Sequence, residues 1–219
     1  MTRAPAILRE ARLLLVDDHA VVRQGLGQIL REAMPRATLG EAETGEQALE
    51  LIRREAWDAV LLDISLPDRN GIEILKEIRQ IAPDLPVLIL TMHPEEQFAL
   101  RALKAGAAGY VTKSTAPAEI VHAVGRVLAR GRYITESLGE KLATDLGRDS
   151  DRMPHERLSD RESEVFGMLA RGHTVKAIAA ALRISVQTVS TYRSRVIEKT
   201  GMKSNADLVQ YAIRNHLVE

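Results

Sequence analysis

Cysteine is absent from the 219-residue sequence, which excludes disulfide bonds, thiol catalysis and zinc sites built on thiolates. Aromatic residues make up 3% of the chain, so its hydrophobic cores must consist mostly of Leu, Ile, Val and Ala. No apolar run reaches the roughly 18 residues that a membrane-spanning helix needs. Arg9, Glu10 and Arg12 interrupt the N-terminal segment, which is not the pattern of a signal peptide. The sequence therefore predicts a cytoplasmic protein without a membrane segment.

A net charge is also missing, because 30 basic residues balance 30 acidic ones. Their distribution is uneven: residues 154–219 contain ten Lys and Arg against seven Asp and Glu, and the preceding part contains 20 against 23. An acidic first part and a basic second part indicate two modules, the second of which binds nucleic acid. A difference of three charges is equally typical of an ordinary solvated surface.

Alternating strand and helix patterns fill residues 12–128. Apolar runs predict strands at 12–16, 38–43, 58–63, 86–91 and 109–111. Apolar residues at helical spacing predict helices at 20–33, 45–54, 71–81, 94–106 and 116–130. Five strands that alternate with five helices favour an α/β doubly wound, five-stranded parallel sheet.

The rest of the chain reads as a linker and a small helical domain. Residues 132–146 form an amphipathic pattern that begins a helix near Thr135, and residues 147–157 are polar with Gly and Pro. Ser159 and Glu162 have the spacing of a capping box, and Ser185 and Ser204 are suitable N-caps. We therefore expect a first domain over 12–128, a linker with an amphipathic helix over 129–153, and an all-α domain over 154–219.

Polar side chains stand where the predicted strands end. Asp17 and Asp18 end the first strand, Asp63 ends the third, Thr91 ends the fourth and Lys113 follows the fifth. Open parallel sheets bind ligands beyond these carboxyl ends. Three carboxylates together need a cation, and oxygen ligands suit Mg²⁺. A metal, a hydroxyl and an ammonium beside a carboxylate can hold a phosphoryl group, with Asp63 as the candidate acceptor. Taken singly, each Asp could instead be a helix cap or turn former.

Residues 175–194 have the pattern of two helices joined by a short turn, which predicts a helix-turn-helix whose second helix enters the major groove of DNA. Hydroxyl and amide side chains reach base edges, whereas Arg and Lys hold phosphates. An ordinary helical bundle with a polar face is the alternative. The candidate DNA-contacting residues are Lys176, Gln187, Thr188, Ser190, Thr191, Arg193, Ser194, Arg195 and Lys199.

The motifs LLVDDH, LLDISLPDRNG, LTMH and GYVTKS resemble the receiver domain of bacterial two-component response regulators over residues 12–128. The resemblance implies a CheY-like (flavodoxin-like) fold in which Asp63 accepts a phosphoryl group from a sensor histidine kinase. It also implies that Asp18 and Asp63 bind Mg²⁺ directly with the backbone carbonyl of Ser65, while Asp17 acts mostly through water.

The same resemblance assigns the switch. Thr91 moves toward the phosphoryl group, Lys113 pairs with it, and Tyr110 occupies the aromatic switch position. One departure is Ser114, where the family often has a proline after a cis peptide bond.

The stretch 158–213 resembles the LuxR-type DNA-binding domain, although Val175 and Ala177 stand where many relatives have Asn and Glu. Both resemblances together imply a regulator of the NarL/FixJ type. They place Ser190, Thr191 and Ser194 at base edges and Lys176, Arg193, Arg195 and Lys199 on the DNA backbone. They imply a homodimer when phosphorylated or DNA-bound, promoter DNA as partner and RNA polymerase as a candidate partner. They also imply dimer contacts at Leu208, Tyr211 and Ala212, for which packing within the helical bundle is the alternative.

Three hypotheses follow. The leading one is a transcription factor controlled by phosphorylation, which is no independent enzyme beyond self-phosphorylation and slow phosphate loss. The second is a phosphate-independent DNA-binding protein whose first domain is a dimerisation scaffold, against which the complete acidic set argues. The third is a free-standing phosphatase of the haloacid-dehalogenase type, which needs an Asp where this chain has Ser65.

Overall fold

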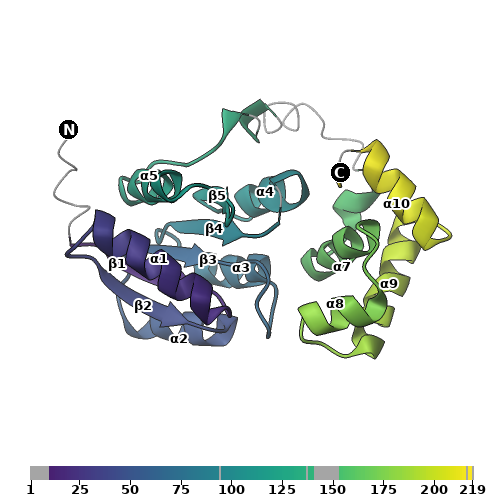
Figure 1. Cartoon of the computed structure of the whole chain (residues 1–219), viewed down its shortest axis with the longest axis horizontal. Helices are drawn as coiled ribbons and strands as arrows, with labels where there is room; N and C mark the ends of the chain where they lie inside the picture. Colours follow the sequence, from purple (N-terminus) through teal and green to yellow (C-terminus); the bar gives the residue numbers. More distant parts are fainter. Residues whose placement is uncertain (1–9, 94, 137, 141–152, 216, 219) are drawn as a thin grey trace. The chain divides into compact units, whose positions relative to one another are not determined.

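The computed structural model describes residues 10–93, 95–136, 138–140, 153–215, 217 and 218 (Figure 1). The chain forms two compact units, which divide after residue 136. This division falls within the linker predicted from the sequence, 129–153.

The first unit is built on a parallel sheet with the strand order β2-β1-β3-β4-β5. Its strands are β1 (Arg12–Val16), β2 (Thr38–Ala42), β3 (Ala59–Leu62), β4 (Val87–Thr91) and β5 (Gly109–Thr112). β1 pairs with β2 and β3 at once, so Leu15 stands opposite both Glu41 and Leu61. The predicted doubly wound α/β fold is confirmed.

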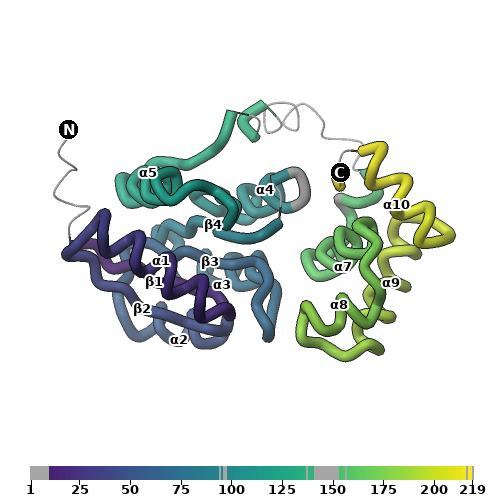
Figure 2. The backbone as a smooth tube through the Cα atoms, in the orientation of Figure 1, coloured from purple at the N-terminus to yellow at the C-terminus, as the bar shows by residue number. Residues whose placement is uncertain are grey.

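Five helices cover the sheet, and they are α1 (Ala20–Ala33), α2 (Gly45–Arg54), α3 (Gly71–Ile81), α4 (Glu95–Lys104) and α5 (Pro117–Leu128). Helices α1 and α5 pack on one face, and α2, α3 and α4 cover the other (Figures 1 and 2). Because both faces are covered, every residue of β3 is buried. This explains the uninterrupted apolar run that leads to Asp63.

Local hydrogen bonds fix the helix ends. The Thr44 side chain accepts from Gln47 N at the start of α2, and Asn70 accepts from Ile72 N at the start of α3. α4 and α5 end earlier than the predicted 94–106 and 116–130, because Gly106 and Arg130 adopt positive φ angles beyond the last helical turns.

The segment after α5 returns to the edge strand of the sheet. Tyr133 N donates to Ala108 O at 2.9 Å, and the Tyr133 hydroxyl donates to Glu119 of α5 at 2.5 Å. Thr135 donates to Glu95 at the start of α4. Glu136 and residues 138–140 are helical, while the rest of the predicted linker helix lies outside the described residues.

The second unit is helical in its described part, as predicted, with η2 (Pro154–Arg157), α7 (Asp160–Ala170), α8 (Val175–Ala181), α9 (Val186–Thr200) and α10 (Asn205–Arg214). Ser159 and Ser204 each form a complete capping box, and Ser185 caps α9. The helices enclose one apolar core, which includes Leu158, Val165, Phe166, Leu169, Ile178, Val189, Val196, Leu208 and Ala212.

Gly71 provides a test of the packing beneath Asp63. A Cβ atom at Gly71 would lie 2.1 Å from the Asp63 carbonyl oxygen and 2.8 Å from Ile64 Cα. We therefore expect Gly71→Ala to lower the free energy of unfolding by about 1–3 kcal/mol, because backbone must shift to relieve the clash. Urea denaturation measures the change.

Gly25 is the matched control, since a Cβ atom there meets nothing within 4 Å and the residue lies inside α1. Gly25→Ala should stabilise the protein by up to about 1 kcal/mol through helix propensity. Equal effects of the two substitutions would contradict the steric argument.

Candidate functional site

Three buried charged groups meet at the carboxyl edge of the sheet. Asp17 follows β1, Asp63 follows β3 and Lys113 follows β5, and each side chain is at most 7% exposed. Lys113 Nζ lies 2.5 Å from Asp17 Oδ2 and 2.6 Å from Asp63 Oδ2. One ammonium is thus shared by two carboxylates.

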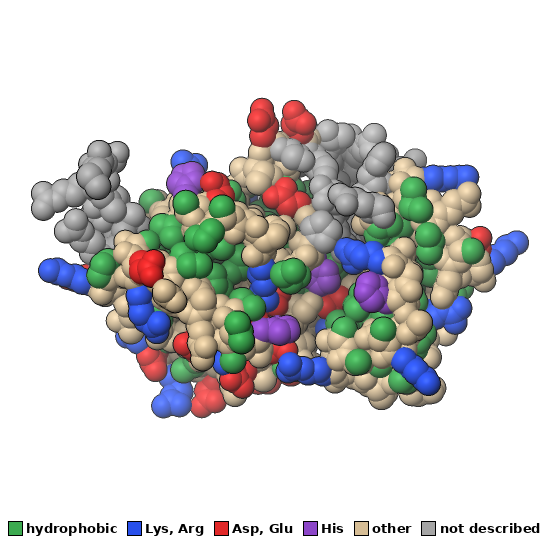
Figure 3. Space-filling view, in the orientation of Figure 1, with side chains coloured by type: hydrophobic (Ala, Val, Ile, Leu, Met, Phe, Trp, Pro, Cys, Tyr) green, Lys and Arg blue, Asp and Glu red, His purple; other side chains and the backbone are tan. Residues whose placement is uncertain are grey.

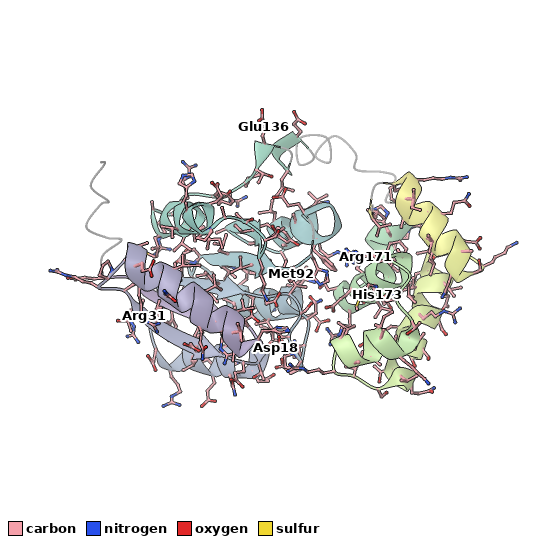
Figure 4. The ribbon with its side chains drawn as sticks, in the orientation of Figure 1. Asp18, Arg31, Met92, Glu136, Arg171 and His173 are labelled. Carbon is pink, nitrogen blue, oxygen red and sulfur yellow. The ribbon has the colours of Figure 1, made fainter. Side chains whose placement is uncertain are left out.

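Asp18 and His19 extend this cluster. One potential ligand atom from each of Asp17, Asp18, His19 and Asp63 lies within 4.8 Å of the others. Figure 4 shows Asp18 beyond β1 and Met92 beyond β4, at the same edge of the sheet. The three carboxylates of this set are compatible with a hard divalent cation such as Mg²⁺, whereas an imidazole is not a ligand that Mg²⁺ prefers. His19 was not among the predicted ligands, although its position beside Asp18 in LLVDDH is a signal.

The charge balance of the site favours an added cation. Burial raises the pKa of Asp63, and Asp17 raises it further, against lowering by Lys113 and a smaller lowering by the Thr91 hydroxyl. Burial lowers the pKa of Lys113, but the attraction of Asp63 and Asp17 outweighs this and raises it overall. The ammonium therefore stays charged, and when both carboxylates are ionised it leaves one negative charge without a partner.

Thr91 places a hydroxyl group beside the carboxylates. The residue is fully buried at the end of β4, and Oγ1 makes no hydrogen bond of normal geometry to any described residue. The hydroxyl group lies close enough to the Asp63 carboxyl group to lower the pKa of Asp63. A buried hydroxyl without a partner costs about 1–3 kcal/mol, so an acceptor that reaches this position would be stabilised.

The segment after β4 is tied to its neighbours on both sides. The Tyr110 hydroxyl, buried inside the domain, donates to His93 O at 2.9 Å. His93 Nε2 lies 2.9 Å from Ser65 Oγ, and the His93 ring contacts Phe98 at a centroid distance of 4.8 Å. His93 was missed by the sequence analysis, although it ends the motif LTMH.

The Lys113–Ser114 peptide bond is trans, since the described residues include no cis peptide bond. With Ser114 in place of the proline, this bond has the ordinary trans form.

In the helical unit, the predicted DNA-contacting residues differ in their contacts, and Thr188 Oγ1 lies 2.7 Å from Ser185 Oγ at the start of α9. Lys176, Gln187 and Arg195 are exposed on α8 and α9, and basic side chains are visible on the surface of this unit in Figure 3. Three hydroxyl groups donate to carbonyl oxygens one turn earlier in α9, and two of these residues, Thr191 and Ser194, are also exposed. These are Ser190 to Val186 at 2.9 Å, Thr191 to Gln187 at 3.0 Å and Ser194 to Ser190 at 3.1 Å.

Two predicted backbone-contacting cations already have partners. Arg193 Nε donates to Asn205 Oδ1 at 2.8 Å, and Lys199 Nζ lies 2.6 Å from Glu162 Oε2. Because Glu162 also closes the capping box of α7, Lys199 links α9 to the start of that helix.

The predicted dimer contacts lie mainly inside the domain. Leu208 and Ala212 are 0% exposed, whereas Tyr211 is half-buried and its hydroxyl lies 2.8 Å from His155 Nδ1. On the same helix, Ile213 is 54% exposed. The dimer contact stays a prediction, and of its three residues Tyr211 presents accessible surface.

The family follows from similarity to known proteins. Residues 13–125 match the response regulator receiver domain, and residues 156–212 match the luxR family of bacterial regulatory proteins. The chain is a response regulator of the NarL/FixJ type. It is 35% identical over 206 residues to response regulator UvrY of Escherichia coli (strain K12), which covers 94% of each chain.

This response regulator also resembles structures of RcsB. One is RcsB from Salmonella enterica serovar Typhimurium, bound to promoter DNA in the presence of the phosphomimetic BeF₃⁻. Another shows two RcsB dimers bound to two parallel DNAs. Each has 25% identity and a TM-score of 0.57, and covers 92% of this chain and 97% of the RcsB chain. Within its described residues, the response regulator has no helix that is long and apolar enough to cross a membrane.

The charge excess at the site predicts a stability cost. Because the pKa of Asp63 is raised above its ordinary value of 3.8, its ionised form disfavours the folded state. Asp63→Asn should therefore raise the free energy of unfolding at neutral pH without divalent cations. The gain should shrink as the pH falls through the raised pKa and vanish below 3.8. Denaturant unfolding at several pH values measures it.

Asp58→Asn is the control for this prediction. Asp58 precedes β3 at the opposite end of the same strand, where its exposed carboxylate accepts from Arg12 N. It should give no comparable gain. A loss of stability in Asp63→Asn would mean that the ion pair with Lys113 outweighs the cost of burial.

Proposed function

We propose that this response regulator is a transcription factor whose promoter binding is controlled by phosphorylation of Asp63 by a partner sensor histidine kinase. The carrying observation is the buried arrangement of Asp17, Asp63 and Lys113, with the Thr91 hydroxyl, which makes no hydrogen bond of normal geometry, beside it. In these terms the receiver domain spans 12–128, the linker 129–153 and the DNA-binding domain 154–219.

The geometry supports transfer of a phosphoryl group to a carboxylate. An Asp63 carboxylate oxygen attacks phosphorus, a new O–P bond forms, and the bond to the donor nitrogen of the kinase histidine breaks. Lys113 is placed to pair with a phosphoryl oxygen, and Thr91 to donate to another.

Asp17, Asp18, Asp63 and the Ser65 carbonyl are the proposed Mg²⁺ ligands. The bound cation supplies neutralisation of the charge on the transferring oxygens. His19 borders this set at 2.7 Å from Asp18.

The outward signal begins at Thr91. A phosphoryl group adds about −1.5 to −2 charges at the sheet edge and offers Thr91 an acceptor of better geometry than the Asp63 carboxylate. Movement of Thr91 displaces His93 two residues later, and with it the carbonyl that holds the Tyr110 hydroxyl. The segment after β4, α4 and β5 then shift between two arrangements, which alters dimerisation and promoter binding.

On DNA, α9 is proposed to enter the major groove. Gln187 and Thr188 at its start, with Ser190, Thr191 and Ser194, face the bases, and Lys176, Arg193, Arg195 and Lys199 hold phosphates. The three hydroxyl groups keep lone pairs for base amino groups while their hydrogens remain bonded within the helix. A homodimer would read two half-sites, with Tyr211 of α10 at its contact and RNA polymerase as a further partner.

Phosphoryl uptake tests the first part of the proposal. Incubation with acetyl phosphate and Mg²⁺ should add one phosphoryl group to the wild type and none to Asp63→Asn, as measured by intact mass. The control is Asp68→Asn in the same loop, because the Asp68 carboxylate is engaged by Gly45 N and Glu46 N at 3.0 Å. It should be modified like the wild type, and uptake by Asp63→Asn would refute the assignment.

Salt dependence tests the DNA interface. Arg195→Ala should weaken binding to all sequences and lower the slope of log K against log salt by about 1, since one phosphate contact is lost. Arg214→Ala removes the same charge from the end of α10, outside the helix-turn-helix, and should leave the slope unchanged. Fluorescence anisotropy across a salt series measures both, and equal slopes for the two variants would remove Arg195 from the interface.

A further inference from the structure

A buried arginine lies behind the acidic cluster. Arg23 belongs to α1 and is 5% exposed. Its guanidinium donates to the Asp17 carbonyl oxygen from Nη1 at 2.6 Å, to Glu41 Oε2 from Nε at 3.1 Å and to Glu43 Oε1 from Nη2 at 2.6 Å. Burying an unpaired charge costs several kcal/mol, roughly, and these three acceptors compensate that cost.

The three acceptors come from two neighbouring strand ends. Glu41 and Glu43 flank Ala42, whose carbonyl accepts from Asp17 N at 3.1 Å. The Asp17 backbone is therefore held on both sides, through its N–H by Ala42 and through its C=O by Arg23. The C=O belongs to the peptide group that joins Asp17 to Asp18, so the contact with Arg23 also orients the start of Asp18.

The charge of Arg23 is not its main contribution to the site. Burial lowers the pKa of Arg23, but hydrogen bonds and attraction from Glu41 and Glu43 raise it overall, so the group is always cationic. Its single positive charge is then outweighed by the two carboxylates that hold it. The three side chains together carry one net negative charge, so Arg23 does not repel a divalent cation, and its own contribution to the site is geometric.

We propose that Arg23 is a positioning residue that presents the Asp17–Asp18 pair to the divalent cation. Asp17 and Asp18 are adjacent and repel each other, so a relaxed backbone would let their carboxylates turn apart. Holding the intervening peptide keeps both aimed at the cluster that includes Asp63. This inference rests on the proposed function, because the cation affinity set by Arg23 limits phosphorylation of Asp63.

The test is the Mg²⁺ dissociation constant of the full-length protein, measured by isothermal titration calorimetry where circular dichroism shows each variant folded. Arg23→Lys keeps the charge but cannot hold three acceptors with one planar fork. Its Mg²⁺ dissociation constant should rise roughly ten-fold, the usual effect of losing a group that orients a metal ligand. The rate of phosphoryl uptake at limiting Mg²⁺ should fall in parallel and recover at saturating Mg²⁺.

Arg12→Gln is the matched control for loss of a guanidinium. Arg12 begins β1, the strand that leads to Asp17, and lies at the end of β1 away from the cluster. It pairs with Glu55 and stacks on Trp57, with 5.0 Å from its guanidinium carbon to the ring centroid. This variant should lose stability without weakening Mg²⁺ binding. A merely structural role of Arg23 would give the same result as Arg12→Gln.

A second variant keeps the inference testable if Arg23→Lys does not fold. Glu43→Ala removes an exposed partner of Arg23 and should weaken Mg²⁺ binding several-fold, roughly, by loosening the guanidinium. Glu46→Ala removes the same charge from the nearby first turn of α2, where Glu46 faces Arg69, and should have a smaller effect.

The outcomes separate the two proposals. Mg²⁺ affinities of Arg23→Lys and Glu43→Ala within about two-fold of the wild type would overturn the role of Arg23. Phosphoryl uptake by the wild type would then leave the proposed function standing. A wild type that binds no Mg²⁺ and takes up no phosphoryl group would overturn both.

Discussion

The sharing of the Lys113 ammonium between Asp17 and Asp63 is the interaction on which the receiver unit depends. It joins the ends of β1, β3 and β5 across the carboxyl edge of the sheet. Two buried carboxylates and one ammonium leave a charge that the fold does not balance, which burial makes costly. The same imbalance makes the edge receptive to a cation, so the site holds a stability cost that a ligand can relieve.

A second group of contacts carries any change at this edge into the domain. Thr91 has a buried hydroxyl without a partner, and His93, two residues later, joins Ser65 on one side and Tyr110 on the other. Well-packed side chains with discrete partners switch between arrangements rather than deform gradually. Tyr133 forms hydrogen bonds to the sheet edge and to α5, and Thr135 forms one to α4. The beginning of the linker therefore contacts the elements that a change at this edge would reach.

In the helical unit, the polar side chains of α8 and α9 have several kinds of partner. Hydroxyl groups of α9 bond within their own helix, and Lys199 and Arg193 join neighbouring helices, while Lys176, Gln187 and Arg195 are exposed. Some residues of the types that line DNA interfaces thus also stabilise the packing of this unit. Leu208 and Ala212 of α10, which were predicted to contact a second copy of the chain, likewise have side chains that fill the core.

Residue patterns are sufficient to predict the order and type of the elements, because apolar periodicity and capping residues such as Ser159 act locally. They also indicate the cluster of Asp17, Asp18 and Asp63, because parallel strands bring their carboxyl ends to one edge. The pairing of the side chains, in contrast, depends on the folded arrangement of the elements. The contact of Arg23 with the Asp17 carbonyl, the bond between His93 and Ser65, and the burial of Leu208 join residues through packing between distant elements. Sequence spacing within one element carries no information about such distances.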